Sequence, residues 1–234
     1  TLSGDGCATY RLVIQGVEAG SYALKIPTMA TAYRLWINEK EVSSNGRVAP
    51  DKSMIPMQKP AVAFYDSSGE DIVILIQVSN YMSDKGGIWE TIYFGKRDTI
   101  LQKRDLSLCI EMILFGAFII MSLYHFGLYL FRKKSSFTLY FGLVCSVIAL
   151  RVILTGEFIL VYFFPGIEWN LQIKAEFLTV FGGFTFFMVF LKKLFSNDFS
   201  DGIVKFYFFS AVFFSLLSII LPVKISARVL PLYH

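Results

Sequence analysis

The sequence is poor in the residues from which catalytic and metal sites are usually built. Its 234 residues include only 2 histidines and 3 cysteines. His125 and His234 have no cysteine, aspartate or second histidine at the spacing of metal ligands. The sequence also contains neither a glycine-rich phosphate loop nor a serine nucleophile elbow. We therefore expect no catalytic residue, no metal site and no cofactor in this chain, and we do not expect it to be an enzyme.

Two further features are missing from the sequence. Cys109 and Cys145 lie in apolar runs and Cys7 has no partner in the first half, so no disulfide framework is predicted. The chain starts at Thr1 without a secretory signal, although the topology argued below places its N-terminus outside the cytoplasm. We expect that it begins after a cleaved signal or is a fragment.

Charged residues are scarce and unevenly placed. They make up 17% of the chain, whereas hydrophobic residues make up 55%, above the roughly 45–50% of a soluble domain. Residues 1–107 hold 12 Lys/Arg and 12 Asp/Glu, while residues 108–234 hold 10 and 6, so the second half supplies the whole net charge of +4. Because this basic excess borders apolar segments, it indicates a membrane surface and gives no support to nucleic-acid binding.

Long apolar runs fill the second half. The clearest lies at residues 106–131 and ends in the basic cluster of Arg132, Lys133 and Lys134. Its length is enough to cross a bilayer at about 1.5 Å per residue. The same criterion predicts four membrane spans, at residues 108–131, 137–154, 171–191 and 203–221.

Loop charges predict the orientation of these spans. Basic residues cluster after the first and third spans, while the loop 155–170 carries Glu157 and Glu168 and no Lys or Arg. Because basic loops stay in the cytoplasm, residues 1–105 should lie outside it. Four spans would return the chain to the outside, so we expect the bundle to be incomplete.

Four ionisable residues within or beside the spans are candidates for coupling between helices. Glu111 and His125 share one face of the first span, Arg151 lies near the outer end of the second, and Glu176 lies near the start of the third. A charge in lipid costs a few kcal/mol, so such residues often have a function. One interpretation is an ion-paired cluster that couples ligand binding to helix movement. The other is a set of interfacial residues that reach toward lipid headgroups.

Residues 1–105 read as β-structure. Strand-length runs rich in β-branched and aromatic residues alternate with clusters of Gly, Pro, Asn, Asp and Ser, and no helical periodicity of useful length precedes Leu106. This pattern predicts a small β-sandwich of jelly-roll type as a first domain, followed at residues 106–234 by a transmembrane helical domain.

Two tryptophans of the first domain lie beside polar groups. Trp36 lies between Arg34 and Asn38 on the polar face of its strand, and Trp89 precedes Glu90. An aromatic ring beside amide and charged groups suits a sugar or another small polar ligand. We therefore treat these five residues as candidate ligand contacts. The alternative is that each tryptophan packs under a loop or against the neighbouring domain.

Several motifs in order resemble one bacterial family. They are GDGCATYRLVI, AYRLWINEKEVSSNGRVA, ILIQVSNYMSDKGGIWETIYFG, MSLYHFGLYLFRKK and LYFGLVCSVIALRVILTGE, followed by a Phe-rich third span. Together they resemble the bacterial seven-transmembrane receptors with diverse intracellular signalling modules. The segment YRLWINEKEV also resembles jelly-roll domains of β-galactosidase and β-glucuronidase relatives. Their hairpin usually reads Asn-Gly, whereas this one reads Asn38-Glu39, which leaves the type of the turn open but does not affect the fold.

The resemblance implies a sensor in the bacterial inner membrane. In that family an extracytoplasmic jelly roll, similar to galactose-binding and other carbohydrate-binding modules, precedes seven helices and a cytoplasmic output such as a histidine kinase or a diguanylate cyclase. This chain would then hold about four of seven spans and no output module. The implied partners are the lipid bilayer, a small saccharide or other periplasmic ligand, and a second copy in a homodimer.

Two other classes of function stay open. A membrane module could use its β-domain to bind another protein, with no small ligand. A transporter could use the same domain to capture its substrate, but the spans show no internal repeat and no helix broken by Gly or Pro at the midplane.

Overall fold

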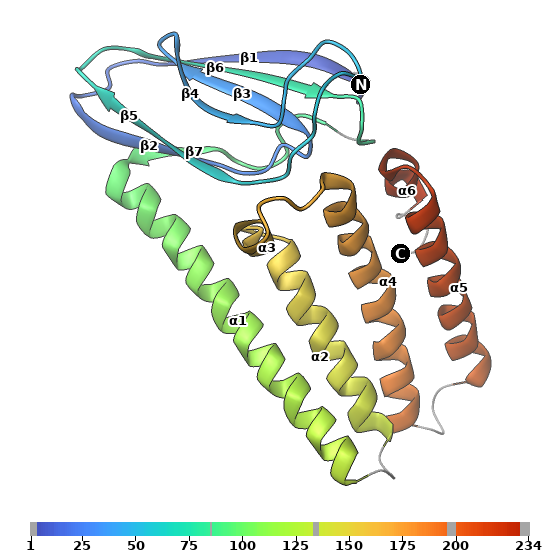
Figure 1. Cartoon of the computed structure of the whole chain (residues 1–234). Helices are drawn as coiled ribbons and strands as arrows, with labels where there is room; N and C mark the ends of the chain where they lie inside the picture. Colours follow the sequence, from blue (N-terminus) through green and yellow to red (C-terminus); the bar gives the residue numbers. More distant parts are fainter. Residues whose placement is uncertain (1–3, 85, 133–135, 196–199, 230–234) are drawn as a thin grey trace. The chain divides into compact units, whose positions relative to one another are not determined.

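The computed structural model describes residues 4–84, 86–132, 136–195 and 200–229. The chain forms two compact units, Thr1–Leu108 and Cys109–His234 (Figure 1). Lys133 and Lys134 of the basic cluster, and His234, lie outside the described residues.

The first unit is a β-sandwich of two antiparallel sheets. One sheet has the order β1-β6-β3-β4 and the other the order β5-β2-β7, so successive strands repeatedly change sheets, as expected for a jelly-roll type (Figure 1). The strands are β1 (Gly6–Ile14), β2 (Gly20–Ile26), β3 (Ala32–Ile37), β4 (Lys40–Asn45), β5 (Ala61–Ser67), β6 (Ile72–Asn80) and β7 (Tyr93–Lys96). The predicted fold class is confirmed.

The core of the sandwich follows from alternation along the strands. In β6 the side chains of Ile72, Ile74, Ile76 and Val78 are buried, while the intervening residues face outward. They meet the buried apolar side chains of β2 and β3 in one cluster. Each large side chain buried in this way contributes about 1.5–3 kcal/mol, which makes the pairing of the two sheets the main source of this unit's stability.

The turn between β3 and β4 has an unusual backbone. Asn38 has φ 45° and Glu39 has φ 70°, so both central residues are left-handed, as a type I′ hairpin turn requires. The turn therefore keeps the backbone class of an Asn-Gly hairpin although its second central residue is Glu39. Asn tolerates this conformation, whereas Glu is strained in it.

The second unit consists of helices. The helices of the chain are α1 (Arg97–Phe131), α2 (Ser136–Leu154), α3 (Ile159–Phe163), α4 (Trp169–Leu194), α5 (Asp201–Ile220) and α6 (Val223–Val229). Within the described residues, four of them, α1, α2, α4 and α5, are long and apolar enough to cross a membrane. They agree with the four predicted spans. Helix α4 packs against both α2 and α5.

Three helical segments differ from the sequence-based prediction. Helix α1 begins at Arg97. We expected the charged stretch before Leu106 not to be helical, and this prediction is wrong. Its polar residues hide the helix from a hydropathy criterion, but Ile100 is only 4% exposed and packs over β7. The short helices α3 and α6 were also not predicted, because helices of 5 and 7 residues carry almost no periodicity.

Replacing Glu39 by glycine is expected to stabilise the sandwich. Relief of the left-handed strain is worth about 1–2 kcal/mol. The extra freedom of glycine in the unfolded chain offsets about 0.5–1 kcal/mol of that gain. We expect Glu39→Gly to raise the free energy of unfolding by roughly 0.5–1 kcal/mol, measured by urea denaturation of the purified chain. The control Lys40→Gly, in β4, should lower it. A lower stability for Glu39→Gly would contradict the turn geometry.

Candidate functional site

Trp36 lies on the outer face of the four-stranded sheet. Leu35 and Ile37, its neighbours in β3, point into the core, so Arg34 and Trp36 point outward. A register shift between Leu35 and Trp36 leaves an extra residue in β4 opposite them. Such a bulge twists the strand locally and can aim a side chain away from the regular pleat.

Charged groups surround the Trp36 ring. The Arg34 guanidinium lies 5.8 Å from the ring centroid and forms an ion pair of 3.4 Å with Glu41 on β4. A guanidinium at this distance is attracted to the face of the indole. Both charged side chains are well exposed, so the pair adds little to stability. Its effect is to place donors and acceptors beside an aromatic face.

A shallow hollow lies against Trp36. It has a volume of about 230 Å³ and is lined by Thr9, Trp36, Glu39, Leu75 and Gln77. The register pairs Thr9 with Gln77 and Trp36 with Leu75, so these residues share the outer face across β1, β6 and β3. A hydroxyl, an amide and a carboxylate therefore surround one aromatic wall.

Asn38 has a structural task at this turn. Its amide nitrogen donates to the Tyr65 hydroxyl (3.0 Å) and to the Asp71 carbonyl (3.2 Å), and its Oδ1 accepts from the Val73 amide (2.7 Å). These bonds tie the β3–β4 turn to β5 and β6. The amide of Asn38 is thus used in holding the turn that carries Glu39, on the rim of the hollow.

The bonds of Tyr65 continue into Glu70. The Tyr65 hydroxyl donates to one carboxylate oxygen of Glu70 (2.6 Å) and the Ser68 hydroxyl to the other (2.5 Å). The bonds from Ser68 and then Tyr65 lower the pKa of Glu70, while the bond to Glu70 raises the pKa of Tyr65. Both shifts keep Glu70 ionised and Tyr65 protonated at neutral pH, which are the forms that this hydrogen bond requires. The bond therefore stabilises the end of β5.

Trp89 and Glu90 occupy a different place. They lie in the segment between β6 and β7, where Trp89 is 52% exposed. Ile88 and Ile92 of this segment line a narrow space of about 180 Å³ beside core residues of both sheets, including Leu24. The hollow at Trp36 does not include Trp89 or Glu90. The structure thus groups Arg34 and Trp36 but does not bring the second tryptophan to them.

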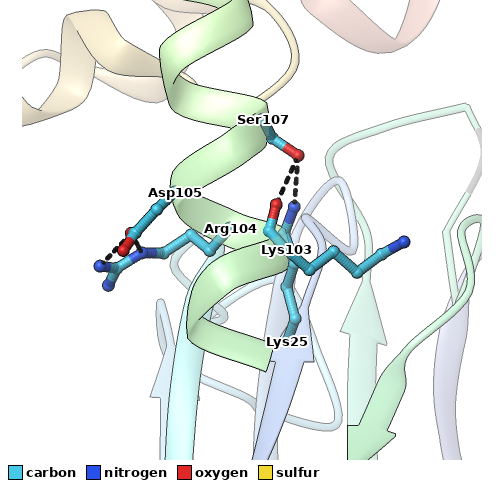
Figure 2. Close-up of polar contacts among 5 residues, drawn as sticks. All are labelled: Lys25, Lys103, Arg104, Asp105 and Ser107. Carbon is cyan, nitrogen blue, oxygen red and sulfur yellow. Dashed lines mark hydrogen bonds and ion pairs between the residues drawn. The ribbon is translucent and has the colours of Figure 1, made fainter. Parts of the chain in front are cut away.

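The first turns of α1 dock on the outer face of the three-stranded sheet. Figure 2 shows Lys25 of β2 reaching the helix, where its Nζ donates to the Ser107 hydroxyl over 3.4 Å. Ser107 in turn donates to the Lys103 carbonyl one turn earlier (3.0 Å). The neighbouring pair of Arg104 and Asp105 is exposed and points to the other side of the helix (Figure 2).

Small residues of the sheet make room for this helix. Ala23 of β2 is paired with Gly95 of β7, and Ala23 is completely buried. A Cβ on Gly95 would be in ordinary van der Waals contact with Cδ1 of Ile100, at 3.6 Å, so only a side chain larger than alanine would press on the helix there. Ile100 is therefore the apolar anchor of α1 on the sheet.

Two cations of α1 cover aromatic rings on the same sheet. The Arg97 guanidinium lies 4.7 Å from the ring centroid of Phe64 on β5, and the Lys103 ammonium lies 4.0 Å from that of Tyr93 on β7. Each contact is worth about 0.5–1 kcal/mol where it is exposed. Together with Ile100 they hold the helix across all three strands.

Glu111 of α1 holds a turn in the second unit. Both of its carboxylate oxygens accept the backbone N–H of Glu157, at 3.1 and 3.2 Å. Gly156 precedes this amide with φ 66°, and a Cβ there would collide with the Glu111 carboxylate. Glu111 therefore caps the segment between α2 and α3. Sequence reasoning missed Gly156, although a glycine just after a helix is a common sign of such a turn.

Arg151 and Glu176 lie between α2 and α4. Arg151 donates from Nη1 to the Glu176 carbonyl (3.4 Å) and to the Thr179 hydroxyl (3.1 Å). In the part of the chain that the structure describes, no ion pair joins Arg151 to the Glu176 carboxylate. Thr179 was missed by sequence reasoning because a hydroxyl in an apolar run gives no signal of its own.

His125 makes a separate contact with α2. Its Nδ1 is 2.8 Å from the Met121 carbonyl, and its ring centroid is 4.5 Å from that of Phe141. One turn earlier, the Ser122 hydroxyl donates to the Gly142 carbonyl (3.0 Å). The four candidate coupling residues thus form three separate contacts and not one cluster. Among the described residues, no group of three or more His, Cys, Asp or Glu could hold a metal ion.

Comparison with known protein families identifies the helical half. The family described as "7TM diverse intracellular signalling" matches residues 107–234, which is more than half of the chain. The chain belongs to this family. It is therefore a multi-pass membrane protein in contact with the lipid bilayer. The domain that defines the family is a sensory receptor domain.

Comparisons outside the 7TM diverse intracellular signalling family add little. No curated protein matches the chain. Two solved structures of a GH2 beta-galacturonidase from Eisenbergiella tayi, bound to glycerol and to galacturonate, are similar to 39% of this chain at 13% identity, with TM-scores of 0.31 and 0.30. The match spans 17% of the length of those chains. A likeness this weak carries no argument about the ligand.

The contact between Glu111 and Gly156 can be tested by a double-mutant cycle. Glu111→Ala removes the acceptor and Gly156→Ala adds a Cβ at a positive φ, so each should lower the stability of the bundle by about 1–3 kcal/mol. Because the added Cβ collides with the carboxylate, the double variant should lose less than the sum, with a coupling of about 0.5–3 kcal/mol. Thermal denaturation in detergent measures all three. Gly127→Ala, where a Cβ meets nothing within 4 Å, is the control, and additive losses would contradict the contact.

Proposed function

We propose that this chain is the sensing part of a bacterial inner-membrane receptor. In this proposal the β-sandwich lies outside the cytoplasm and binds a small ligand, and the helices pass the signal to a cytoplasmic output module in the full-length protein. The family match supports a membrane sensor, and the basic residues after the first and third spans support the orientation. The observation that carries the proposal is the docking of α1 on the sandwich, because it ties the exported domain to a membrane helix.

The ligand site proposed is the hollow beside Trp36. A sugar ring presents one apolar face and a rim of hydroxyls, so it needs an aromatic surface flanked by hydrogen-bonding groups. Trp36 supplies the surface, and Thr9, Gln77 and Glu39 supply the polar groups. The Arg34 guanidinium beside the ring adds a donor that favours a hydroxylated or acidic saccharide. Trp89 and Glu90 would form a second, separate contact surface.

Transmission would use α1 as a rigid lever. Its first turns are fixed on the three-stranded sheet by Ile100, Lys25 and the two cation–π contacts, and the same helix continues to Phe131. A ligand that changes the twist of the sandwich would therefore bias the position of the helix, by no more than its differential affinity for the two states. Glu111, His125, Arg151 and Glu176 would hold the membrane helices in each arrangement, and a homodimer would bring two such levers together.

A tryptophan exchange tests the ligand site. The whole chain in nanodiscs is titrated with a panel of neutral and acidic monosaccharides and β-linked disaccharides, followed by calorimetry. For a saccharide that binds, Trp36→Ala should weaken the affinity by about 1–2 kcal/mol, roughly 5- to 30-fold, because the stacking surface is lost. Trp36→Phe, which keeps a smaller ring, should lose less.

Two controls make this result interpretable. Asp66→Asn alters an exposed residue of β5, on the other sheet, and should leave the affinity unchanged. Trp89→Ala separates the two tryptophans: a loss confined to that variant would move the site to the segment after β6. If no saccharide binds and the melting temperature stays constant, the protein-binding interpretation takes the place of saccharide sensing.

Removing the apolar anchor tests transmission. Ile100→Ala should cost the helix–sheet contact about 2–4 kcal/mol, because a buried side chain is truncated without replacement. We expect amide hydrogen exchange in residues 97–105 to become faster. Protection changes that a saccharide induces in the rest of α1 should disappear while its affinity is unchanged.

Gln102→Ala is the matched control, since this exposed residue lies on the same helix two positions later. It should behave as the parent does. If Ile100→Ala leaves the induced protection changes intact, α1 does not carry the signal, whatever the sandwich binds.

A further inference from the structure

A cavity of the second unit lies between α2, α4 and α5. It has a volume of about 550 Å³, within the range of small-molecule sites, which is roughly 300–1,000 Å³. Arg151 and Glu176 line it together with mainly apolar and aromatic side chains such as Val144, Phe184 and Phe187. An apolar site with two charged groups of opposite sign calls for a particular kind of ligand.

Polarity changes along the length of this cavity. On α4 the lining runs from Glu176 to Phe187, eleven positions further along the chain, or about 16 Å of helix. On α2 it runs from Arg151 back to Val144. Both charged residues belong to the same end, because Arg151 reaches the carbonyl of Glu176. The cavity therefore has one charged end and a long remainder that is apolar except for Tyr207 of α5, which suits the shape of an amphiphile.

Among the described residues, the two charged groups interact electrostatically but form no ion pair. Arg151 donates from Nη1 to the Glu176 carbonyl and to the Thr179 hydroxyl. A charge at a lipid-facing or half-buried position is costly without a partner. A ligand carrying both an anion and a cation would satisfy both groups at once.

We propose that this cavity binds a zwitterionic aminophospholipid of the ethanolamine type from the surrounding bilayer. The lipid phosphate would accept hydrogen bonds from the Arg151 guanidinium, whose planar fork suits phosphate oxygens. The primary ammonium would donate to the Glu176 carboxylate, and one acyl chain would lie along Val180 and Phe184 toward Phe187. This inference concerns the membrane unit alone and does not rest on ligand binding by the sandwich.

Photo-crosslinking tests the proposal directly. The whole chain is reconstituted in nanodiscs that contain phosphatidylethanolamine with a diazirine on one acyl chain, irradiated, digested and analysed by mass spectrometry. Labelling is expected on peptides that contain Val144, Phe184 or Phe187, and it should exceed labelling by the matched phosphatidylcholine and phosphatidylglycerol probes. The reason is that trimethylated choline cannot donate to a carboxylate and glycerol carries no cation.

Three variants separate the parts of the site. Arg151→Gln should lower this labelling about tenfold, as expected for a lost charge-assisted hydrogen bond. Glu176→Gln should abolish the preference for ethanolamine over glycerol while retaining some labelling. Val180→Phe should fill the cavity and reduce labelling by every probe without touching either charge.

Lys205→Gln is the control, because it removes an exposed charge of α5 that does not line the cavity. Thermal denaturation of each variant shows whether the bundle is intact, and labelling is compared only between variants with the parent's melting temperature. Equal labelling by all three lipids, unchanged in Arg151→Gln and Val180→Phe, would mean ordinary bilayer contact and overturn the proposal. Labelling confined to other helices, or a crosslink to a protein segment at Phe184, would overturn it as well.

Discussion

Helix α1 must satisfy two environments with one stretch of backbone. Its first turns meet a β-sheet, where Ile100 needs an apolar surface and Lys25 needs an acceptor such as Ser107. Its later turns are apolar enough for lipid, where every backbone N–H and C=O has to be bonded within the helix. A continuous helix meets both demands, because its backbone N–H and C=O groups bond to one another on the sheet and in lipid alike.

The sheet under α1 is shaped by this demand. A flat helix contact needs small residues at its centre and larger ones at its sides, and the central pair Ala23 and Gly95 is small while Phe64 and Tyr93 lie beside it. Among the described residues of the first unit, no helix covers the outer face of the opposite sheet, which carries Trp36 and the polar groups around it. One sheet therefore carries the helix, and the other carries the hollow that we propose as a ligand site.

Polar side chains inside each unit serve mainly to bind backbone. Asn38 bonds the Asp71 carbonyl and the Val73 amide, and Glu111 bonds the amide after Gly156. In both places a left-handed residue creates a turn whose polar groups need partners, and one side chain supplies them. Arg151 also binds backbone, because it donates to the Glu176 carbonyl of α4. These roles explain why a polar residue in an otherwise apolar stretch is not by itself a sign of a ligand or an ion pair.

The sequence by itself determined the membrane spans, the two-part division of charge, and the sandwich, because hydropathy over about 20 residues and strand alternation are local properties. It could not show that a helix begins at Arg97. The residues before Leu106 are polar, and the contact of Ile100 with β7, which stabilises this part of the helix, is made only in the folded chain. It placed Trp36 on a polar face, but the hollow beside it depends on Thr9, Leu75 and Gln77 from strands that are far apart in the chain. Only the tertiary structure decided that Glu111, His125 and Arg151 have separate partners, because the helices' rotation about their axes and packing partners are set by contacts that no single segment contains.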